Sequence, residues 1–179
     1  MIQDQYLTEN YILSNVFAKF PTERPEVVTS PFGWRVRNGV TEFHYGDDFI
    51  NQAGHKNLFS VVAGRVIGEG FEDKVPGHPE IPRRGYYLQV RFNFIDGRTW
   101  DGEYNHMKKR SSFRIGNGIL PAVVIGEIGQ TGTATGDHLH FMVVADGRYR
   151  EPSLWLNNLE LIAQDRRRIR RLRELGDVA

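Results

Sequence analysis

The chain has 179 residues, of which 40% are hydrophobic and 25% charged, and its formal net charge is +1. This length and composition indicate one globular domain with a sizeable core, and the small net charge argues against a general binder of polyanions. The sequence contains no cysteine. Disulfides are therefore excluded, and any metal ion must be held by histidine and carboxylate side chains.

Residues 1–28 are predicted to form an N-terminal extension that packs on the domain. The apolar side chains between Tyr6 and Phe17 suit a short amphipathic helix, which Pro21 and Pro25 would end. The first residues have neither the basic segment nor the apolar run of a signal peptide. No stretch approaches the roughly 18 apolar residues that a membrane span requires.

Residues 29–153 have the pattern of an antiparallel β domain. Glycines separate short segments rich in Val, Ile, Tyr and Phe, which is typical of half-buried strands. No long helical periodicity appears, so we expect a mainly β protein with an antiparallel sheet or sandwich. The predicted strands are residues 48–50, 58–63, 86–94, 100–104, 122–128 and 138–144, with turns at Gly33, Gly39, Gly64, Gly97, Gly102 and Gly147.

Two connections within this domain can be read from their turn residues. Residues 71–85 contain three prolines in quick succession and are predicted to be a loop, which is either a wall of a binding site or a simple insertion. The Asp96-Gly97 pair lies between two predicted strands and indicates a hairpin.

Residues 154–179 are predicted to form a basic amphipathic helix. An apolar stripe runs from Leu156 to Leu175, and six arginines lie between Asp165 and Glu174. These arginines either form a solvated helix face or contact an anionic partner such as teichoic acid, lipid headgroups or an acidic protein surface. A nucleic-acid partner is disfavoured because the sequence carries no recognised binding motif for one.

The strongest chemical signal is the tripeptide His138-Leu139-His140. The two histidines occupy positions i and i+2 of a predicted strand, so both imidazoles project from one face while Leu139 faces the core. Two imidazoles that project together into one site are suited to binding a metal ion.

A second signal is His44 with Asp48, because a spacing of four also returns to the same face of an extended chain. A histidine and a carboxylate together suit zinc or a similar divalent ion. His106 follows another predicted strand and is a third candidate. His55 and His78 lie in loops without a supporting pattern, and we interpret both as solvated.

Taken together, these elements resemble the signature of the lysostaphin-like, LytM-type family of zinc endopeptidases. That signature is a His-x-x-x-Asp element, a later Tyr-x-His element, and a His-x-His near the end of the domain. Here the same order is given by His44…Asp48, Tyr104-Asn105-His106 and His138-Leu139-His140. Accessory segments also match, at Ser30–Arg35, Val61–Val66 and Ile125–Gly132, so the resemblance covers roughly residues 29–153.

The resemblance implies a zinc-dependent endopeptidase that cuts the peptide stems and cross-bridges of bacterial peptidoglycan. His44, Asp48 and His140 would hold one zinc ion per chain, and His106 and His138 would be the catalytic histidines. A catalytic zinc commonly has three protein ligands and activates water for attack on the scissile amide. We assign the general base to His138, whereas His106 would either stabilise the oxyanion or donate a proton to the leaving amine.

The sequence departs from the family pattern at three positions outside these five residues. Asp47 stands where the family usually has an apolar residue, Asp137 where proline or serine is common, and Met142 where an acid is frequent. We expect Asp47 either to be solvated or to contact a cationic group of the substrate.

Two other functions stay open. Some LytM-like domains have lost catalysis and activate other wall hydrolases, although such domains lack at least one of the five site residues that this chain retains. A wall-binding module would instead need an aromatic groove, for which the candidates are Trp34, Tyr45, Tyr86, Tyr87 and Trp100.

The implied substrate lies outside the cell membrane, whereas the sequence shows no export signal. We therefore expect action at the bacterial cell wall and consider three origins for the chain. It is a bacteriophage protein carried in the virion or released as a lysin, a trimmed mature chain, or a domain of a longer exported protein.

Overall fold

The computed structural model describes residues 20–158, apart from residues 25, 38, 75, 78–82 and 94–98. The predicted N-terminal helix, His78, the Asp96-Gly97 turn and the arginine-rich segment lie outside the described residues. The predicted domain boundaries stay predictions. Within the described part of the chain, no helix is both long enough and apolar enough to cross a membrane.

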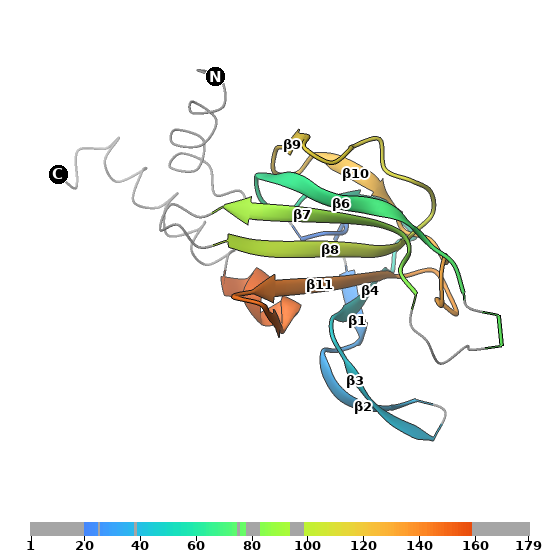
Figure 1. Ribbon diagram of the computed structural model, residues 1–179. Coiled ribbons are helices and arrows are strands. Elements are labelled where there is room, and N and C mark those ends of the chain that lie inside the picture. The colour runs from blue at the N-terminus through green and yellow to red at the C-terminus, as the bar shows by residue number, and fades with distance from the viewer. Residues whose placement is uncertain are drawn as a thin grey trace, which may run out of the picture.

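A large antiparallel sheet dominates the molecule, which confirms the predicted mainly β fold (Figure 1). Its strands follow the order β1-β4-β11-β8-β7-β6-β9, and β12 also pairs with β11. In that order they are β1 (Glu26–Ser30), β4 (Asp47–Asn51), β11 (Leu139–Ala145), β8 (Thr99–Met107), β7 (Gly85–Asn93), β6 (Gly64–Glu72) and β9 (Gly118–Ile119), with β12 at Arg148–Arg150.

Two smaller antiparallel sheets accompany the large one. In the first, β5 (Asn57–Phe59) pairs with β10 (Val124–Glu127). In the second, β2 (Gly33–Arg37) and β3 (Val40–His44) form a hairpin that projects away from the large sheet, at the bottom of Figure 1. Because β3 is followed at once by β4, this hairpin is joined directly to the large sheet.

One face of the large sheet forms the hydrophobic core. Side chains alternate along a strand, so every second residue of β7, β8 and β11 points to this face. The helical residues 152–158 add Trp155 and Leu156 to it. The buried side chains include Leu88, Val90, Phe92, Tyr104, Leu139, Phe141 and Val143. The intervening residues, among them Asn105 and His140, therefore lie on the opposite face.

Some sequence predictions within the sheet are wrong. Gly102 lies inside β8 and not in a turn; a Cβ there would come within 2.7 Å of the Phe92 ring, so the glycine makes room for that side chain. The predicted strand 58–63 ends at Phe59, and the chain bends before β6 begins at Gly64. The glycine-rich β6 was missed because its pattern has too few apolar residues.

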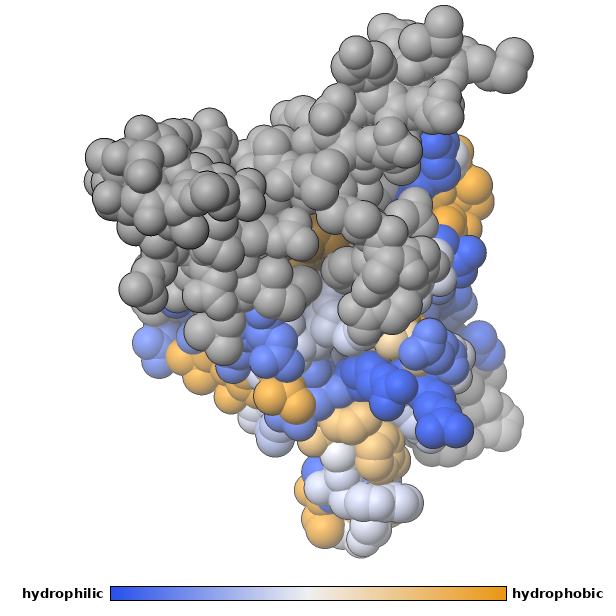
Figure 2. All heavy atoms as spheres, turned by 90° about the vertical axis from the view of Figure 1, so that its left-hand side faces the viewer, coloured by the Kyte–Doolittle hydropathy of each residue, from blue (hydrophilic) through white to orange (hydrophobic). Residues whose placement is uncertain are grey.

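The β2–β3 hairpin has two chemically different faces. One carries Trp34 and Val36, whose exposed fractions of 75% and 72% leave them open to solvent. Figure 2 shows this lower end of the molecule as a pale to orange surface beneath a band of hydrophilic blue. The other face carries Arg35 and His44, which the alternation of the strands directs toward β4. Of the aromatic residues proposed for a groove, Trp34 contacts Phe43 at the hairpin, whereas Trp100 stacks on Trp155 at the core.

Candidate metal centre

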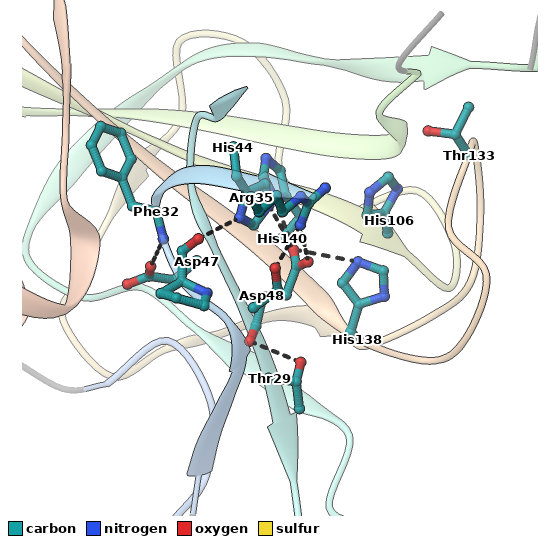
Figure 3. Close-up of polar contacts among 12 residues, drawn as sticks. Thr29, Phe32, Arg35, His44, Asp47, Asp48, His106, Thr133, His138 and His140 are labelled. Atoms are coloured by element: carbon teal, nitrogen blue, oxygen red, sulfur yellow. Dashed lines mark hydrogen bonds and ion pairs between the residues drawn. The ribbon is translucent and has the colours of Figure 1, made fainter. Parts of the chain in front are cut away.

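Three side chains from separate strands meet on the face of the sheet opposite the core (Figure 3). His44 ends β3, Asp48 lies in β4, and His140 lies in β11 directly opposite Asp48. The His140 Nδ1 is 2.8 Å from Asp48 Oδ1 and 3.0 Å from His44 Nε2, and His44 Nε2 is 3.3 Å from Asp48 Oδ1. These three atoms form a group that could hold a metal ion.

The chemistry of this donor set fits zinc. Four-coordinate zinc with ligand bonds of about 2.0–2.1 Å places its ligand atoms about 3.3 Å apart, close to the separations here. His44 Nδ1 lies 3.0 Å from the Pro31 carbonyl oxygen. When Nδ1 carries the proton and donates it to that carbonyl, the lone pair of Nε2 is free for a metal. Two imidazole nitrogens at 3.0 Å also require a proton or a cation between them.

Electrostatics favour the protonation states that bind a metal. Burial by itself raises the pKa of Asp48, but hydrogen bonds with His140 and His44 outweigh it and hold that pKa below its ordinary value. Burial lowers the pKa of the His140 imidazole, against the opposing attraction of Asp48. An ionised carboxylate and a neutral imidazole are the forms in which these side chains act as ligands.

His106 and His138 complete the cluster. The His138 Nε2 lies 3.5 Å from Asp48 Oδ1, and the His106 and His138 ring centroids are 4.9 Å apart. Each ring places Nδ1 against a backbone carbonyl at 2.8 Å, that of Thr131 for His106 and that of Gly136 for His138. With the proton on Nδ1, both Nε2 atoms are left as acceptors.

His106 is held in an unusual backbone conformation. Its φ is 61°, in the left-handed region that few non-glycine residues adopt, and its backbone N–H donates to the Arg84 carbonyl at 2.7 Å. Burial lowers the pKa of the His106 imidazole to about 3, and the neighbouring His138 and His140 add to the effect. The imidazole is therefore neutral near pH 7.

Thr131 fixes the segment that orients His106, and sequence reasoning assigned it no role. Its hydroxyl donates to the Met107 carbonyl at 2.8 Å and accepts from the Tyr86 N–H at 2.9 Å. Its own carbonyl accepts from His106 Nδ1. One threonine therefore joins β7, β8 and the loop before β11. The only sequence signal was its position in a glycine- and threonine-rich turn just before the His-x-His element.

The expectation for Asp47 is wrong. Its side chain is neither solvated nor available to a substrate, because the residue is only 1% exposed. One carboxylate oxygen accepts from the Phe32 N–H at 2.7 Å, and the other accepts from the N–H and hydroxyl of Ser153. Asp47 is a structural anchor that holds the Pro31 and Phe32 segment against the start of the 152–158 helix. Pro31 in turn supplies the carbonyl that orients His44.

All five residues that the sequence indicated for the site lie together. They come from β3, β4, the end of β8, and the start of β11 with the residue before it. Their assignment as ligands or catalytic groups stays a prediction. His55 lies apart and is exposed, with its Nδ1 3.2 Å from a Glu23 carboxylate oxygen, in agreement with the interpretation of a solvated histidine.

Comparison with known proteins gives a family match over most of the described domain. The family model described as peptidase family M23 matches residues 42–152, a range that contains all five residues of the cluster. A protein of Haemophilus influenzae named an uncharacterized metalloprotease is 30% identical, over 82% of this chain and 29% of its own length.

Solved structures share the fold. A zinc-containing peptidase from Vibrio cholerae has a TM-score of 0.60 and 25% identity, over 77% of this chain and 39% of that one. The catalytic domain of the antimicrobial peptidase lysostaphin from Staphylococcus simulans has a TM-score of 0.53 and 21% identity, over 74% of this chain and 91% of that one. The lysostaphin comparison shows likeness of fold alone. The chain spans less than half the length of the Haemophilus and Vibrio proteins.

Proposed function

Because this chain belongs to peptidase family M23, we propose that it is a zinc-dependent endopeptidase that hydrolyses peptide cross-links in bacterial peptidoglycan. The observation that carries the proposal is the convergence of His44 Nε2, Asp48 Oδ1 and His140 Nδ1 beside two further histidines. The donor set leaves a fourth position for water or substrate, as catalytic zinc sites require.

The bound zinc would lower the pKa of a water molecule and polarise the scissile carbonyl. The protein's own part is proton transfer. His138 is the general base, because its ring lies beside the three candidate ligands and, with its proton on Nδ1, its Nε2 is left as an acceptor. With its proton on Nδ1, neutral His106 leaves Nε2 as an acceptor. The leaving amine therefore takes up the proton that His138 removed from the water, either directly or through His106 Nε2, whose ring lies 4.9 Å from that of His138.

The cell wall is the proposed place of action. Lysostaphin, whose catalytic domain shares this fold, is described as an antimicrobial peptidase, and this supports a bacterial wall as the substrate. The proposed partners are the peptide stems and cross-bridges of peptidoglycan, bound along the face of the sheet that carries the cluster. A bacteriophage origin stays a prediction, as does an anionic partner for the arginine-rich segment.

The proposal is tested by incubating the zinc-loaded protein with purified peptidoglycan and measuring newly released amino groups. His106→Asn removes the imidazole, while asparagine tolerates the left-handed backbone better than alanine does. We expect this variant to lose about 10²–10⁴-fold in rate. The matched control His55→Asn changes an exposed histidine outside the cluster and should cleave like the wild type.

Two results would contradict the proposal. In the first, the zinc-loaded wild type binds several types of cell wall but cleaves none of them. This result would favour a wall-binding module. The other is equal cleavage by wild type and His106→Asn, which would place the chemistry elsewhere. Mass analysis of the released peptides identifies the bond that is cut.

A further inference from the structure

Arg35 of the β2–β3 hairpin lies against the candidate metal ligand Asp48 (Figure 3). Its Nη1 donates to the Ser30 hydroxyl at 2.6 Å and lies 3.4 Å from Asp48 Oδ2. Its Nε donates to a Glu42 carboxylate oxygen at 2.7 Å, and its Nη2 is also 2.7 Å from that oxygen. The side chain is 23% exposed, so the guanidinium is mostly shielded from solvent.

The two oxygens of the Asp48 carboxylate therefore have different surroundings. Oδ1 faces His140 Nδ1 and His44 Nε2, at 2.8 and 3.3 Å. Oδ2 faces Arg35. A guanidinium on one oxygen fixes the plane of the carboxylate and leaves the other oxygen to the metal, as groups behind metal ligands commonly do.

Arg35 is itself held in place by Glu42 and Ser30. Glu42 lies directly opposite it in the hairpin register, and Ser30 lies directly opposite Asp48 in the β1–β4 pair. The rigid fork of a guanidinium can engage Glu42, Ser30 and Asp48 together, which the single ammonium group of lysine cannot do. The hairpin therefore places an oriented guanidinium beside Oδ2 of Asp48.

We propose that Arg35 is a positioning residue of the metal centre, which holds Asp48 through Oδ2 so that Oδ1 alone faces the metal. This inference rests on the proposed zinc site. The opposing interpretation is that Arg35 only pairs with Glu42 to stabilise the hairpin. A partly exposed ion pair of that kind contributes little to stability, and under this interpretation its loss leaves the zinc dissociation constant unchanged.

The two interpretations differ in the zinc dissociation constant, measured at equilibrium by competition with a chromophoric chelator. Arg35→Met keeps the aliphatic stem and removes the guanidinium. We expect it to weaken zinc binding by about 10–100-fold. The matched control is Arg37→Met, two residues along the same strand and exposed. It should bind zinc within about twofold of the wild type.

Three further measurements complete the test. In EDTA, urea unfolding should show Arg35→Met to be only slightly less stable than Arg37→Met, because the partly exposed pair with Glu42 contributes little, and this loss should be much smaller than the loss in zinc binding. Arg35→Lys should recover part of the affinity, and Glu42→Gln should lose part of it, because Glu42 orients the guanidinium. The inference is overturned if Arg35→Met binds zinc as tightly as Arg37→Met, or if its weaker binding is matched by an equal loss of stability in EDTA.

The outcome is separable from that of the proposed function. If the wild type binds zinc but does not cleave walls, the endopeptidase proposal is contradicted. The zinc affinities of Arg35→Met and Arg37→Met would still test the role of Arg35. A wild type that binds no zinc overturns both.

Discussion

Asp47 and Asp48 are neighbours in β4, and their carboxylates lie in different environments. Asp48 points to the face that carries the histidines, where it meets His44 and His140. Asp47 is buried and accepts hydrogen bonds from Phe32 and Ser153. Alternation along a strand separates two chemically identical side chains into a candidate metal ligand and a structural anchor.

Asp47→Asn should destabilise the protein. The amide offers one acceptor oxygen in place of two, so either the Phe32 or the Ser153 N–H loses its partner in a buried setting. We expect a loss of about 1–3 kcal/mol in the free energy of unfolding, measured by urea denaturation. Asp146→Asn, in an exposed turn where asparagine suits a φ of 52°, is the control and should change stability by less than about 0.5 kcal/mol. Equal stabilities for the two variants would refute the anchor role.

At the scale of elements, the short connection between β3 and β4 determines how His44 approaches β11. Gly46 lies in that connection. A Cβ at this position would come within 2.4 Å of the Phe141 carbonyl oxygen and 2.9 Å of His140 Cε1. Only glycine allows the backbone to lie this close to the strand that carries His140.

Gly46→Ala should therefore damage both the fold and the metal site. A methyl group there must push the connection away from β11, at a cost of about 1–3 kcal/mol or more, and the shift separates His44 from His140. We expect lower stability together with weaker zinc binding. Gly118→Ala, where a Cβ meets nothing within 4 Å, is the control. Unchanged zinc affinity in Gly46→Ala would show that the close approach does not set the geometry of the site.

The sequence predicted those parts of the site that local pattern determines. His138 and His140 follow from strand alternation, and Leu139 does face the core with 0% exposure. Asp47 could not be assigned, because its partners Phe32 and Ser153 lie 15 and 106 residues away. A polar side chain is expected at the surface unless its distant partners are known. Thr131 and Arg35 were missed as functional residues for the same reason, since their roles depend on contacts between strands.

At the scale of the whole molecule, folding buries His106 and His140 and favours their neutral forms. The pKa of His106 lies at about 3, below its ordinary value of 6.5, and that of His140 is also lowered by burial. The unfolded chain therefore binds protons on these groups before the folded chain does as the pH falls. Where the unfolded state holds more protons than the folded state, the free energy of unfolding decreases as the pH falls.

In EDTA, the free energy of unfolding should decline as the pH falls from about 6.5 toward 4.5. Glu103 acts in the opposite direction, because burial raises its pKa and the folded state then takes up a proton first. His106→Asn removes one buried histidine and should reduce the decline, while His55→Asn should leave it unchanged. Urea denaturation at a series of pH values measures this. An identical decline in wild type and His106→Asn would contradict the account.

The central claim is that β3, β4 and β11 bring His44, Asp48 and His140 together to hold one zinc ion. The most direct measurement is the zinc content of purified protein by mass spectrometry after dialysis against trace zinc, with His140→Ala and His55→Ala alongside. We predict about one zinc per chain in the wild type and in His55→Ala, and almost none in His140→Ala. Wild-type protein without stoichiometric zinc, or His140→Ala with the same content as the wild type, would contradict the claim.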